Sequence, residues 1–538
     1  MTPSRNTPTQ PAFGAAGMVS SAHPLATQAG VDILTAGGNA FDAAVATAAT
    51  LSVVEPMMSS LGGYGTILLY DAQAGEAWFL NSSGRIPAAV DSDAFRPPTP
   101  GYLENRRGAK AVSTPGNLNA WTAMSKKYGQ LDCRRQSWRR LFDAAILAAD
   151  EGFVISEMAA RYIQSEFASF PEHAQRIYGH DGRPLQSGER LIQQDLANSL
   201  TLIAEQGVKV FYEGELGQAI DAAMRESGGF LSLDDLRRDR AEWRKPISID
   251  CRGYTIVTAS PPANSFDMLV RVGMMSRFDL ESLGHNTTAY LHRYAEVTQH
   301  GFWARLRYAG DPEISPPPLE MLLSEKYWED QVAQIDLERA RPFEPPRAFG
   351  PGGHTTHLVA ADRWGNVVSS TQTVGGDFGS KVMPPGTGIW LNNSLEYCTF
   401  EPKGNPMDAF PGRHKLSGDC PTLVLRKGKP WIALGTPGGH TIGQTVPQML
   451  LNMLYFQMDI QQAIAAARIS FVEPDGLAVE DEISQSVRQE LAGMGHNIRV
   501  DKKLGNAHGL TIEYDANGKP FQFTGGSDPR GQGAAMGC

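Results

Sequence analysis

The sequence predicts an α/β protein, more narrowly α+β, in which stacked β-sheets are covered by helices on both outer faces. The main observation is three hairpins in the last third of the chain, each with two apolar, β-branched segments around a polar turn. They span residues 355–374, 422–434 and 510–523. Amphipathic helices alternate with these hairpins, at 445–456, 460–468 and 484–494. Layers of sheets and helices bury the apolar faces of both kinds of element.

The rest of the chain is expected to be mainly helical. Residues 24–55 show helical periodicity that Gly37-Gly38-Asn39 interrupts, and the alanine-rich second half suits close helix packing. A Gly-rich turn at 59–65 precedes a strand at 66–70 and lacks the strand–turn–helix order of a nucleotide-binding loop. The other expected elements are helices at 137–226 and in a stretch ending near Tyr308, with a strand at 247–258.

Composition excludes some classes of function. The chain has 538 residues, of which 41% are apolar and 20% charged, as is normal for a globular protein. A net charge of −10 argues against nucleic acid or an anionic membrane as a partner, because both require a basic surface. Five widely spaced cysteines indicate a reduced compartment and supply no zinc ligand set. We therefore expect no metal and no cofactor, and we interpret His300 and His440 as structural or pocket-lining residues.

The N-terminus bears on localisation. Residues 1–13 are polar and lack the apolar segment of a signal peptide, and no run of about 18 apolar residues is long enough to span a bilayer. We therefore expect a cytoplasmic protein, although a chain that had lost its leader would look the same.

Thr355 is the main candidate for a nucleophile. It opens a predicted strand, 355–361, directly after a Pro/Gly-rich segment at 346–353 of the kind in which a chain can be cut. A hydroxyl is a weak nucleophile, but a cut before Thr355 would free an α-amine, with a pKa of about 7.7–8.0, to act as its base. Because a lone strand threonine is usually structural, this hypothesis depends on further motifs.

Two further motifs fit such a nucleophile. Gly435-Thr436-Pro437-Gly438-Gly439 lies between a predicted strand and an apolar helix, where backbone N–H groups and the helix dipole favour an oxyanion. A simple anion site or a plain turn would have the same sequence. Thr373 ends the hairpin that Thr355 opens, so antiparallel pairing would bring its hydroxyl back beside Thr355, unless it is only a structural strand residue.

These motifs resemble the γ-glutamyltransferases, a family of self-cleaving N-terminal-nucleophile enzymes. The resemblance covers nearly the whole chain, from Gly17-Met18-Val19 to Gly526-Ser527-Asp528-Pro529-Arg530. The matching segments in between are 37–44, 113–116, 145–153, 310–312, 391–393, 420–422 and 435–439. The resemblance implies a four-layer αββα sandwich. It also implies a proenzyme that cleaves between His354 and Thr355 into a large subunit, 1–354, and a small subunit, 355–538.

The same resemblance implies a role for each reactive residue. Thr355 corresponds to the nucleophile, Thr373 to the threonine that hydrogen-bonds it, and Gly438 and Gly439 to the oxyanion hole. Arg85 corresponds to the arginine that holds the substrate's α-carboxylate, a role that suits a bidentate guanidinium. Arg85 lies closer to the following proline than in the usual pattern, and a surface salt bridge is the alternative interpretation.

The residues expected to recognise a glutamyl group depart from the family pattern. Gly375 stands where asparagine is usual. In Ser394-Leu395-Glu396-Tyr397 the first acid of an acidic pair is kept as Glu396, whereas the second, which holds the substrate's amino group, is replaced by Tyr397. The usual serine pair appears as Ser417-Gly418. Each lost hydrogen bond to an ammonium would cost roughly 1.5–3 kcal/mol, so glutamyl preference would be weak.

We therefore expect an amidohydrolase or acyltransferase that acts on small carboxylate-bearing acyl groups, oxamate-like or glutaryl-like, through a threonyl acyl-enzyme. The short connection 397–416 predicts an open site, unless it is simply a trimmed surface loop. One alternative is an orthodox γ-glutamyltransferase or glutathione hydrolase, in which Glu396 or Asp377 replaces the missing acid. The other is an unprocessed, silent binding scaffold. The expected partners are a small-molecule amide and the two subunits of one precursor, and association beyond these subunits stays open.

Overall fold

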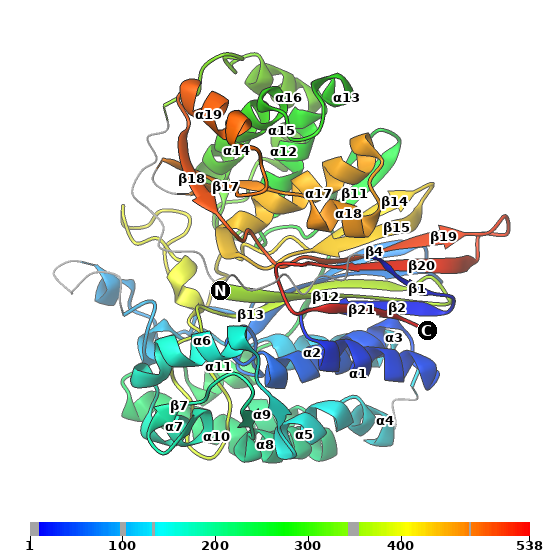
Figure 1. The fold of residues 1–538 in the computed structure, drawn as a ribbon. Coiled ribbons are helices and arrows are strands. Elements are labelled where there is room, and N and C mark those ends of the chain that lie inside the picture. Colours follow the sequence, from blue (N-terminus) through cyan, green and yellow to red (C-terminus); the bar gives the residue numbers. More distant parts are fainter. Residues whose placement is uncertain (1–9, 97–103, 132–134, 343–353, 473–474) are drawn as a thin grey trace.

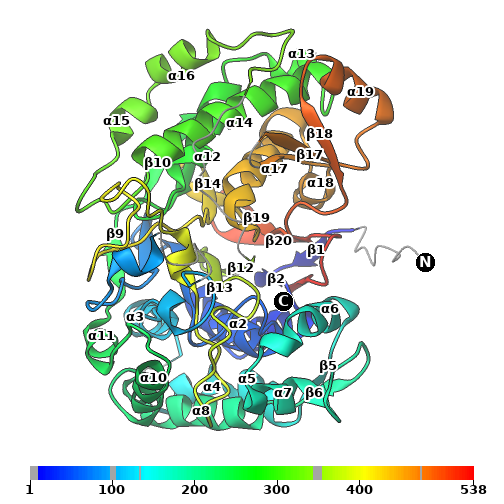
Figure 2. The same cartoon turned by 90° about the vertical axis from the view of Figure 1, so that its left-hand side faces the viewer.

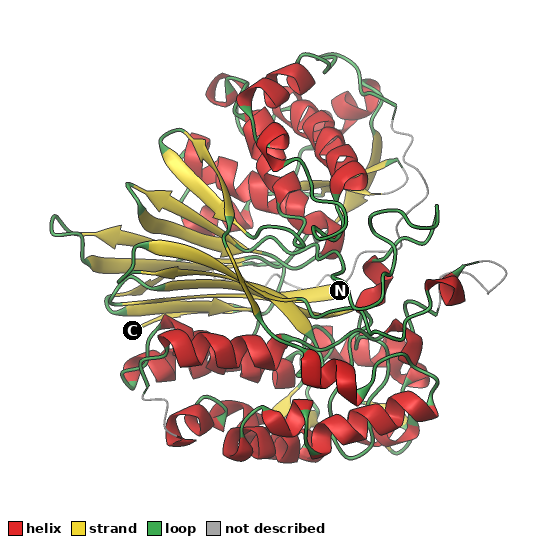
Figure 3. Ribbon diagram, turned by 180° about the vertical axis from the view of Figure 1, so that it is seen from behind, coloured by secondary structure: helices red, strands yellow, loops and turns green. Residues whose placement is uncertain are grey.

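The computed structural model describes residues 10–96, 104–131, 135–342, 354–472 and 475–538. Two β-sheets lie in the middle of the molecule, with one layer of helices on each side (Figure 1). Figure 3 shows the same arrangement from behind, with the strands enclosed between helices above and below. The predicted αββα sandwich is therefore confirmed. The Pro/Gly-rich segment expected before Thr355 lies outside the described residues.

Thr355 belongs to the first sheet, in which neighbouring strands are antiparallel. In spatial order its strands are β21 (Ala534–Gly537), β2 (Gly17–Ser21), β12 (His354–Asp362), β13 (Val367–Gly375), β3 (Tyr64–Asp71), β4 (Glu76–Ser82) and β9 (Glu242–Arg244). The hairpin β12–β13 therefore occupies the middle of the sheet, where both of its edges are paired.

The second sheet is also antiparallel and packs face to face with the first. Its strands are β1 (Ala12–Gly14), β20 (Pro520–Ser527), β19 (His508–Tyr514), β15 (Lys429–Gly435), β14 (Thr422–Arg426), β11 (Tyr254–Thr258) and β10 (Ile247–Cys251). The single strand predicted at 247–258 is wrong, because Arg252 and Gly253 both take positive φ, 55° and 79°, and turn the chain into a hairpin. Nothing in the sequence indicates that an arginine takes positive φ, so Gly253 is the one residue of this turn that a sequence pattern could have identified.

Apolar side chains fill the spaces between the layers. Leu68, Val359 and Leu423 belong to the core between the two sheets. Helix α2 (Ala40–Val54) covers the outer face of the first sheet and is buried along its whole length, as its run of small residues allows. Asn39 caps α2 in a capping box with Asp42. The sequence therefore determines both where this helix starts and how closely it packs.

Different parts of the chain form the two helical layers (Figure 2). The layer beside α2 contains α1 (Pro24–Thr35), α3 (Asn117–Tyr128), α4 (Arg135–Arg140), α5 (Asp143–Asp150), α6 (Glu157–Glu166), α7 (Glu172–Tyr178), α8 (Gln194–Gln206), α9 (Lys209–Tyr212), α10 (Glu215–Glu226) and α11 (Leu233–Arg238). The layer on the second sheet contains α12 (Phe266–Met275), α13 (Leu280–Leu283), α14 (Thr288–Tyr308), α15 (Leu319–Leu322), α16 (Glu325–Val332), α17 (Ile442–Phe456), α18 (Ile460–Ala465) and α19 (Gln485–Gly493).

A smaller sheet lies beside this second helical layer. It consists of β16 (Ile469–Val472), β17 (Gly476–Glu480) and β18 (Asn497–Asp501). Short pairs are formed by β5 (Phe153–Val154) with β8 (Arg190–Leu191), and by β6 (Gly179–His180) with β7 (Arg183–Pro184). None of the described helices is both long enough and apolar enough to cross a membrane.

Candidate active site

Thr355, Thr373 and Tyr64 form a row across three neighbouring strands. Thr355 of β12 pairs with Thr373 of β13, and Thr373 pairs with Tyr64 of β3. Residues aligned in this way project from the same face of a sheet. Thr66, two residues along β3 and therefore on this face, donates a hydrogen bond to Asp419, which lies just before β14 of the second sheet (2.9 Å). The row therefore faces the space between the two sheets.

The opposite face of the same strand is fixed by Glu55. The Thr356 hydroxyl donates a hydrogen bond of 2.7 Å to Glu55 Oε2, at the end of α2. Glu55 is 2% exposed, and burial raises the pKa of its carboxyl to about 7, against the opposing effects of the Thr356 hydrogen bond and the charge of Lys503. Helix α2 thus holds the start of β12 from behind, which orients Thr355 toward the second sheet.

The Thr355 hydroxyl is buried and has no hydrogen-bond partner within the described parts of the chain. Such a group costs about 1–3 kcal/mol, so its presence calls for a functional explanation. It lines a cavity of about 300 Å³. The other lining residues are Glu55, Met58, Met158, Tyr162, Pro437, Gly438, Thr441, Val472, Asp501, Lys503, Leu504, Gly505 and Asn506. Thr355 therefore combines an unpartnered hydroxyl with a place on the wall of a cavity large enough for a small ligand.

Gly438 and Gly439 form the turn between β15 and α17. Their φ angles are +135° and +56°, and a Cβ on Gly438 would lie 2.4 Å from Thr441 Oγ1. Only glycine fits this backbone without strain. Gly438 lines the cavity next to the positive end of α17, the arrangement that favours an anion or oxyanion.

The pairing of β13 with β12 places Thr373 directly beside Thr355. The Thr373 hydroxyl oxygen accepts a hydrogen bond from the backbone N–H of Gly375 (2.8 Å). Because the two threonines are paired in register, the Thr373 side chain lies next to that of Thr355 on the same face. This placement allows the hydrogen-bonding role that the sequence predicts for Thr373.

Asparagine in place of Gly375 would require the neighbouring side chains to move. The φ of Gly375 is +96°, and a Cβ there would lie 2.0 Å from Asn393 Oδ1 and 3.0 Å from Glu396 Oε1. Glu396 Oε2 accepts from Asn393 Nδ2 (3.1 Å), whereas Oε1 is buried without a partner among the described residues. Burial raises the pKa of Glu396 to about 7, and the charge of Asp377 contributes to the rise. Glu396 therefore lies beside the β12–β13 hairpin with one oxygen atom unpaired among the described residues.

Tyr397 and Gly418 lie beside the turn of Gly438 and Gly439. A Cβ on Gly418 would lie 3.6 Å from the carbonyl oxygen of Gly439 and 4.0 Å from Cε1 of Tyr397. Tyr397 is 6% exposed, so an aromatic ring occupies the position where the family has an acid. Ser417 donates to Asp419 Oδ2 (2.8 Å), so its hydroxyl is already engaged.

Ser394 is tied into a separate buried network. Its hydroxyl donates to Asn392 Oδ1 (2.8 Å) and forms a second, shorter contact with the hydroxyl of Ser113. This network joins two of the segments on which the family resemblance rests, 113–116 and 391–393. The geometry gives Ser394 a structural role.

Arg85 is not among the residues that line the Thr355 cavity. Its guanidinium pairs with Glu242 (2.7 Å) and Glu313 (3.3 Å) and donates to the carbonyl of Gly412 (3.2 Å). Its side chain is 40% exposed. Because two carboxylates already neutralise Arg85, the geometry favours the salt-bridge interpretation over the predicted grip on substrate.

Lys415 is a buried cation that the sequence analysis missed. Its ammonium group donates a short hydrogen bond to the carbonyl of Ser83 and lies 4.0 Å from the ring centre of Tyr64, in the row of Thr355. Lys415 is 2% exposed, and burial lowers its pKa to about 7 although Asp419 favours the charged form. No motif marks this lysine, because its neighbours come from distant segments.

Two cavity-lining residues were also missed, Glu55 and Lys503. Glu55 ends a predicted helix and Lys503 lies in a polar loop, so neither stands out in the sequence. The ammonium group of Lys503 lies 3.5 Å from Met158 Sδ across the cavity wall. Only the structure brings these two ionisable groups beside Thr355.

Two facing antiparallel sheets between helical layers form the fold of the N-terminal-nucleophile hydrolases. Within this class, the chain belongs to the gamma-glutamyltranspeptidase family, whose model matches residues 26–538.

Proteins similar to this chain have two kinds of name. The Acylase ACY 1 proenzyme of Pseudomonas sp. (strain V22) is 33% identical over 96% of this chain and 95% of its own length. The glutathione hydrolase proenzyme of Bacillus subtilis (strain 168) is 32% identical over 97% and 92%. The crystal structure of cephalosporin acylase from Bacillus halodurans superposes with a TM-score of 0.90, at 29% identity, over 100% of this chain and 99% of that one. The family thus includes acylases and glutathione hydrolases.

Proposed function

We propose that this protein is a self-processing amidohydrolase with Thr355 as its nucleophile. The observation that supports this proposal best is the buried, unpartnered Thr355 hydroxyl on the wall of a cavity that Gly438 also lines. Relatives named as acylase and glutathione hydrolase proenzymes support both the reaction class and the processing.

In the proposed self-processing, the Thr355 hydroxyl attacks the carbonyl carbon of His354. The peptide C–N bond breaks, an ester forms, and water then hydrolyses the ester. The products are a large subunit, 1–354, that ends in a carboxylate and a small subunit, 355–538, that begins with the free α-amine of Thr355. That amine, with a pKa of about 7.7–8.0, is then available as a base.

In the proposed turnover, the Thr355 hydroxyl attacks the substrate amide and its α-amine takes the proton. Negative charge develops on the carbonyl oxygen, beside the turn of Gly438 and Gly439. The α-amine returns the proton to the leaving amine, and the acyl group stays on Thr355 as an ester. Water, activated by the same amine, hydrolyses the ester and releases the acid. An acceptor amine in place of water would give transfer.

We propose small carboxylate-bearing acyl groups, oxamate-like or glutaryl-like, as the acyl part of the substrate. Lys415 replaces Arg85 as the proposed partner of the carboxylate. Neither residue lines the Thr355 cavity, but Lys415, unlike Arg85, forms no ion pair among the described residues. Two strand spacings, about 10 Å, separate Thr355 from Tyr64, whose ring Lys415 covers. Tyr397 offers no carboxylate to an α-amino group.

A γ-glutamyltransferase or glutathione hydrolase is the second candidate. It is favoured by one observation, the unpaired Oε1 of Glu396 beside Gly375, which is able to accept a hydrogen bond from an α-ammonium group. A carboxylate that binds an ammonium is stabilised in its charged form, so the pKa of Glu396 would fall on binding.

A denaturing gel with intact masses tests the nucleophile. Wild type should give two fragments that meet between His354 and Thr355, and Thr355→Ala should remain one chain. Thr511→Ala, in β19 of the second sheet, is the matched control and should cleave like wild type. One uncut chain in wild type would refute self-processing and favour the silent scaffold.

Three p-nitroanilides then test the acyl group. Glutaryl, γ-glutamyl and pentanoyl anilides differ only in a carboxylate and an α-amine. We expect kcat/KM to be highest for glutaryl, and Lys415→Met should reduce glutaryl turnover toward that of pentanoyl. A higher kcat/KM for the γ-glutamyl anilide would favour the γ-glutamyltransferase or glutathione hydrolase over the first candidate. Equal values for the glutaryl and pentanoyl anilides would refute carboxylate recognition.

A further inference from the structure

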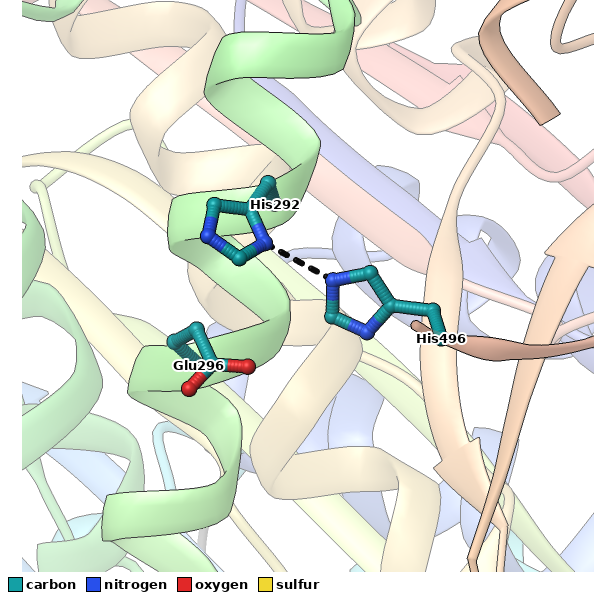
Figure 4. A group of neighbouring side chains, drawn as sticks. All are labelled: His292, Glu296 and His496. Atoms are coloured by element: carbon teal, nitrogen blue, oxygen red, sulfur yellow. Dashed lines mark hydrogen bonds between the residues drawn. The ribbon is translucent and has the colours of Figure 1, made fainter. Parts of the chain in front are cut away.

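A second cluster of chemically reactive side chains lies in the helical layer on the second sheet. His292 and Glu296 are one turn apart on α14, and His496 comes from the segment between α19 and β18 (Figure 4). One ligand atom from each residue lies within 4.8 Å of the others. The three residues are 0%, 1% and 8% exposed. They therefore form one buried set of two imidazoles and a carboxylate.

Hydrogen bonds determine the tautomer of His292. Its Nε2 lies 2.8 Å from the backbone carbonyl of Asp336, so this nitrogen must donate. Its Nδ1 is then unprotonated and directs its lone pair at His496 Nε2, 2.8 Å away. A ring nitrogen that donates to a backbone carbonyl while the other presents a lone pair is the arrangement of metal-binding histidines.

Glu296 supplies the carboxyl group of the cluster. Its Oε1 accepts a hydrogen bond from the backbone N–H of Arg341 (3.2 Å). Within the residues that the structure describes, Glu296 forms no ion pair, although the charge of Arg341 lies near enough to act on it. Burial of such a carboxylate is costly unless a cation compensates it.

A second group, formed by Asp311, Glu313 and His414, does not need a cation in this way. Arg85 and Arg413 both pair with Glu313, at 3.3 and 2.7 Å. The local charges there are already balanced by guanidinium groups. The contrast singles out the cluster of His292.

Space for a further ligand adjoins His496. A cavity of about 280 Å³ is lined by His496 together with Ala295, Gln299, Arg341, Gly495 and Asn497, among others. Gly495 directly precedes His496, and its φ of +105° turns the chain at this point. The nitrogen ligands of a tetrahedral zinc ion are about 3.4 Å apart, given bonds of about 2.05 Å, so the two rings must part by about 0.5 Å.

We propose that His292, Glu296 and His496 bind one divalent transition-metal ion of the zinc type, with water from the adjoining cavity as the fourth ligand. Two imidazoles, one carboxylate and a water molecule are a known zinc ligand set. On binding, the Nε2 proton of His496 moves to Nδ1, which frees Nε2 as a ligand. The ion joins α14 to the start of β18, whose last residue, Asp501, lines the Thr355 cavity.

The full-length protein, stripped with a chelator and then given Zn²⁺, tests this proposal. We expect one zinc ion per chain after gel filtration, and X-ray absorption of wild type should show two imidazole ligands. His496→Asn and Glu296→Gln should each weaken Zn²⁺ binding, at least about 100-fold for the histidine, since loss of even an outer-shell partner costs 10–100-fold. Bound zinc should also raise the unfolding temperature of wild type.

Two matched variants complete the test. His300→Asn changes another buried histidine of α14 and should bind zinc like wild type, whereas His414→Asn changes the other cluster and should also leave binding intact. A wild type that retains no zinc, or whose absorption spectrum lacks two imidazoles, would overturn the proposal even if His496→Asn failed to fold. Zinc binding that survives His496→Asn, or that is lost in His414→Asn, would also overturn it.

Discussion

Glu55→Gln should change how the stability of this protein depends on pH. Glu55 is 2% exposed at the end of α2, and its carboxyl accepts a hydrogen bond from Thr356 directly behind the candidate nucleophile. Burial raises the pKa of Glu55 from its ordinary value of 4.5 to about 7, and the Thr356 hydrogen bond opposes this rise. The folded protein therefore holds a proton on Glu55 that the unfolded chain releases more easily.

The size and sign of the effect follow from these two pKa values. Below pH 4.5 the carboxyl is protonated in both states, and its ionisation costs the fold nothing. Between pH 4.5 and 7 the unfolded chain loses the proton first, so the free energy of unfolding falls as the pH rises. The full loss, reached above pH 7, is about 3 kcal/mol at 1.36 kcal/mol for each pH unit between the two values. Glu55→Gln should remove this loss.

Urea unfolding from pH 4.5 to 8 measures the difference. A Thr355→Ala background is suitable, because our proposal expects it to remain one chain. Relative to that parent, Glu55→Gln should gain about 3 kcal/mol of unfolding free energy between pH 4.5 and 8. Thr356→Val removes the hydrogen bond that lowers the pKa of Glu55, so it should extend the fall to higher pH at about the same slope. Parallel curves for Glu55→Gln and its parent would refute the reasoning.

Three further perturbations test the surroundings of the site. Arg468→Met removes one of two guanidinium partners of the buried Asp528, which keeps its ion pair with Arg530, so it should destabilise the protein by about 1.5–3 kcal/mol in denaturant unfolding; no measurable change would contradict it. Gly438→Ala should lower kcat about 100- to 1,000-fold, the range for a lost oxyanion donor, whereas Gly428→Ala, at positive φ in open space, should leave kcat unchanged. Tyr397→Asp should raise kcat/KM for γ-glutamyl relative to glutaryl anilide, and an unchanged ratio would show that this position does not select the α-amine.

Features that depend on neighbouring residues could be predicted from the sequence. The hairpin that carries Thr355 and Thr373 is one continuous segment, so alternation and a polar turn predict both its existence and the pairing of its two ends. The turn at Gly438 is similarly local, because positive φ marks glycine positions. The prediction of one strand at 247–258 was wrong because the turn begins at Arg252, and arginine rarely takes positive φ.

Features that depend on tertiary contacts between distant segments could not be predicted. Lys415 meets Ser83 and Tyr64 across more than three hundred residues, and Glu55 meets Thr356 across 301. Arg85, whose sequence context matched a binding arginine approximately, is instead neutralised by two carboxylates from other parts of the chain. Charge pairing of this kind is decided by the fold as a whole, and no local pattern reports it.

The division between local features and tertiary contacts also separates the residues proposed for bond making from those proposed for substrate selection. The residues proposed to make and break bonds lie in one hairpin and one turn, whose geometry the backbone fixes. The charges that would meet a substrate, those of Lys415 and Glu396, are both buried, and burial brings the pKa of each to about 7. A substrate carboxylate would favour the charged form of Lys415, and a substrate ammonium would favour that of Glu396. On this proposal, selectivity would depend on which of these two buried groups the acyl chain reaches, and a single substitution at Tyr397 would change that balance without touching the proposed nucleophile.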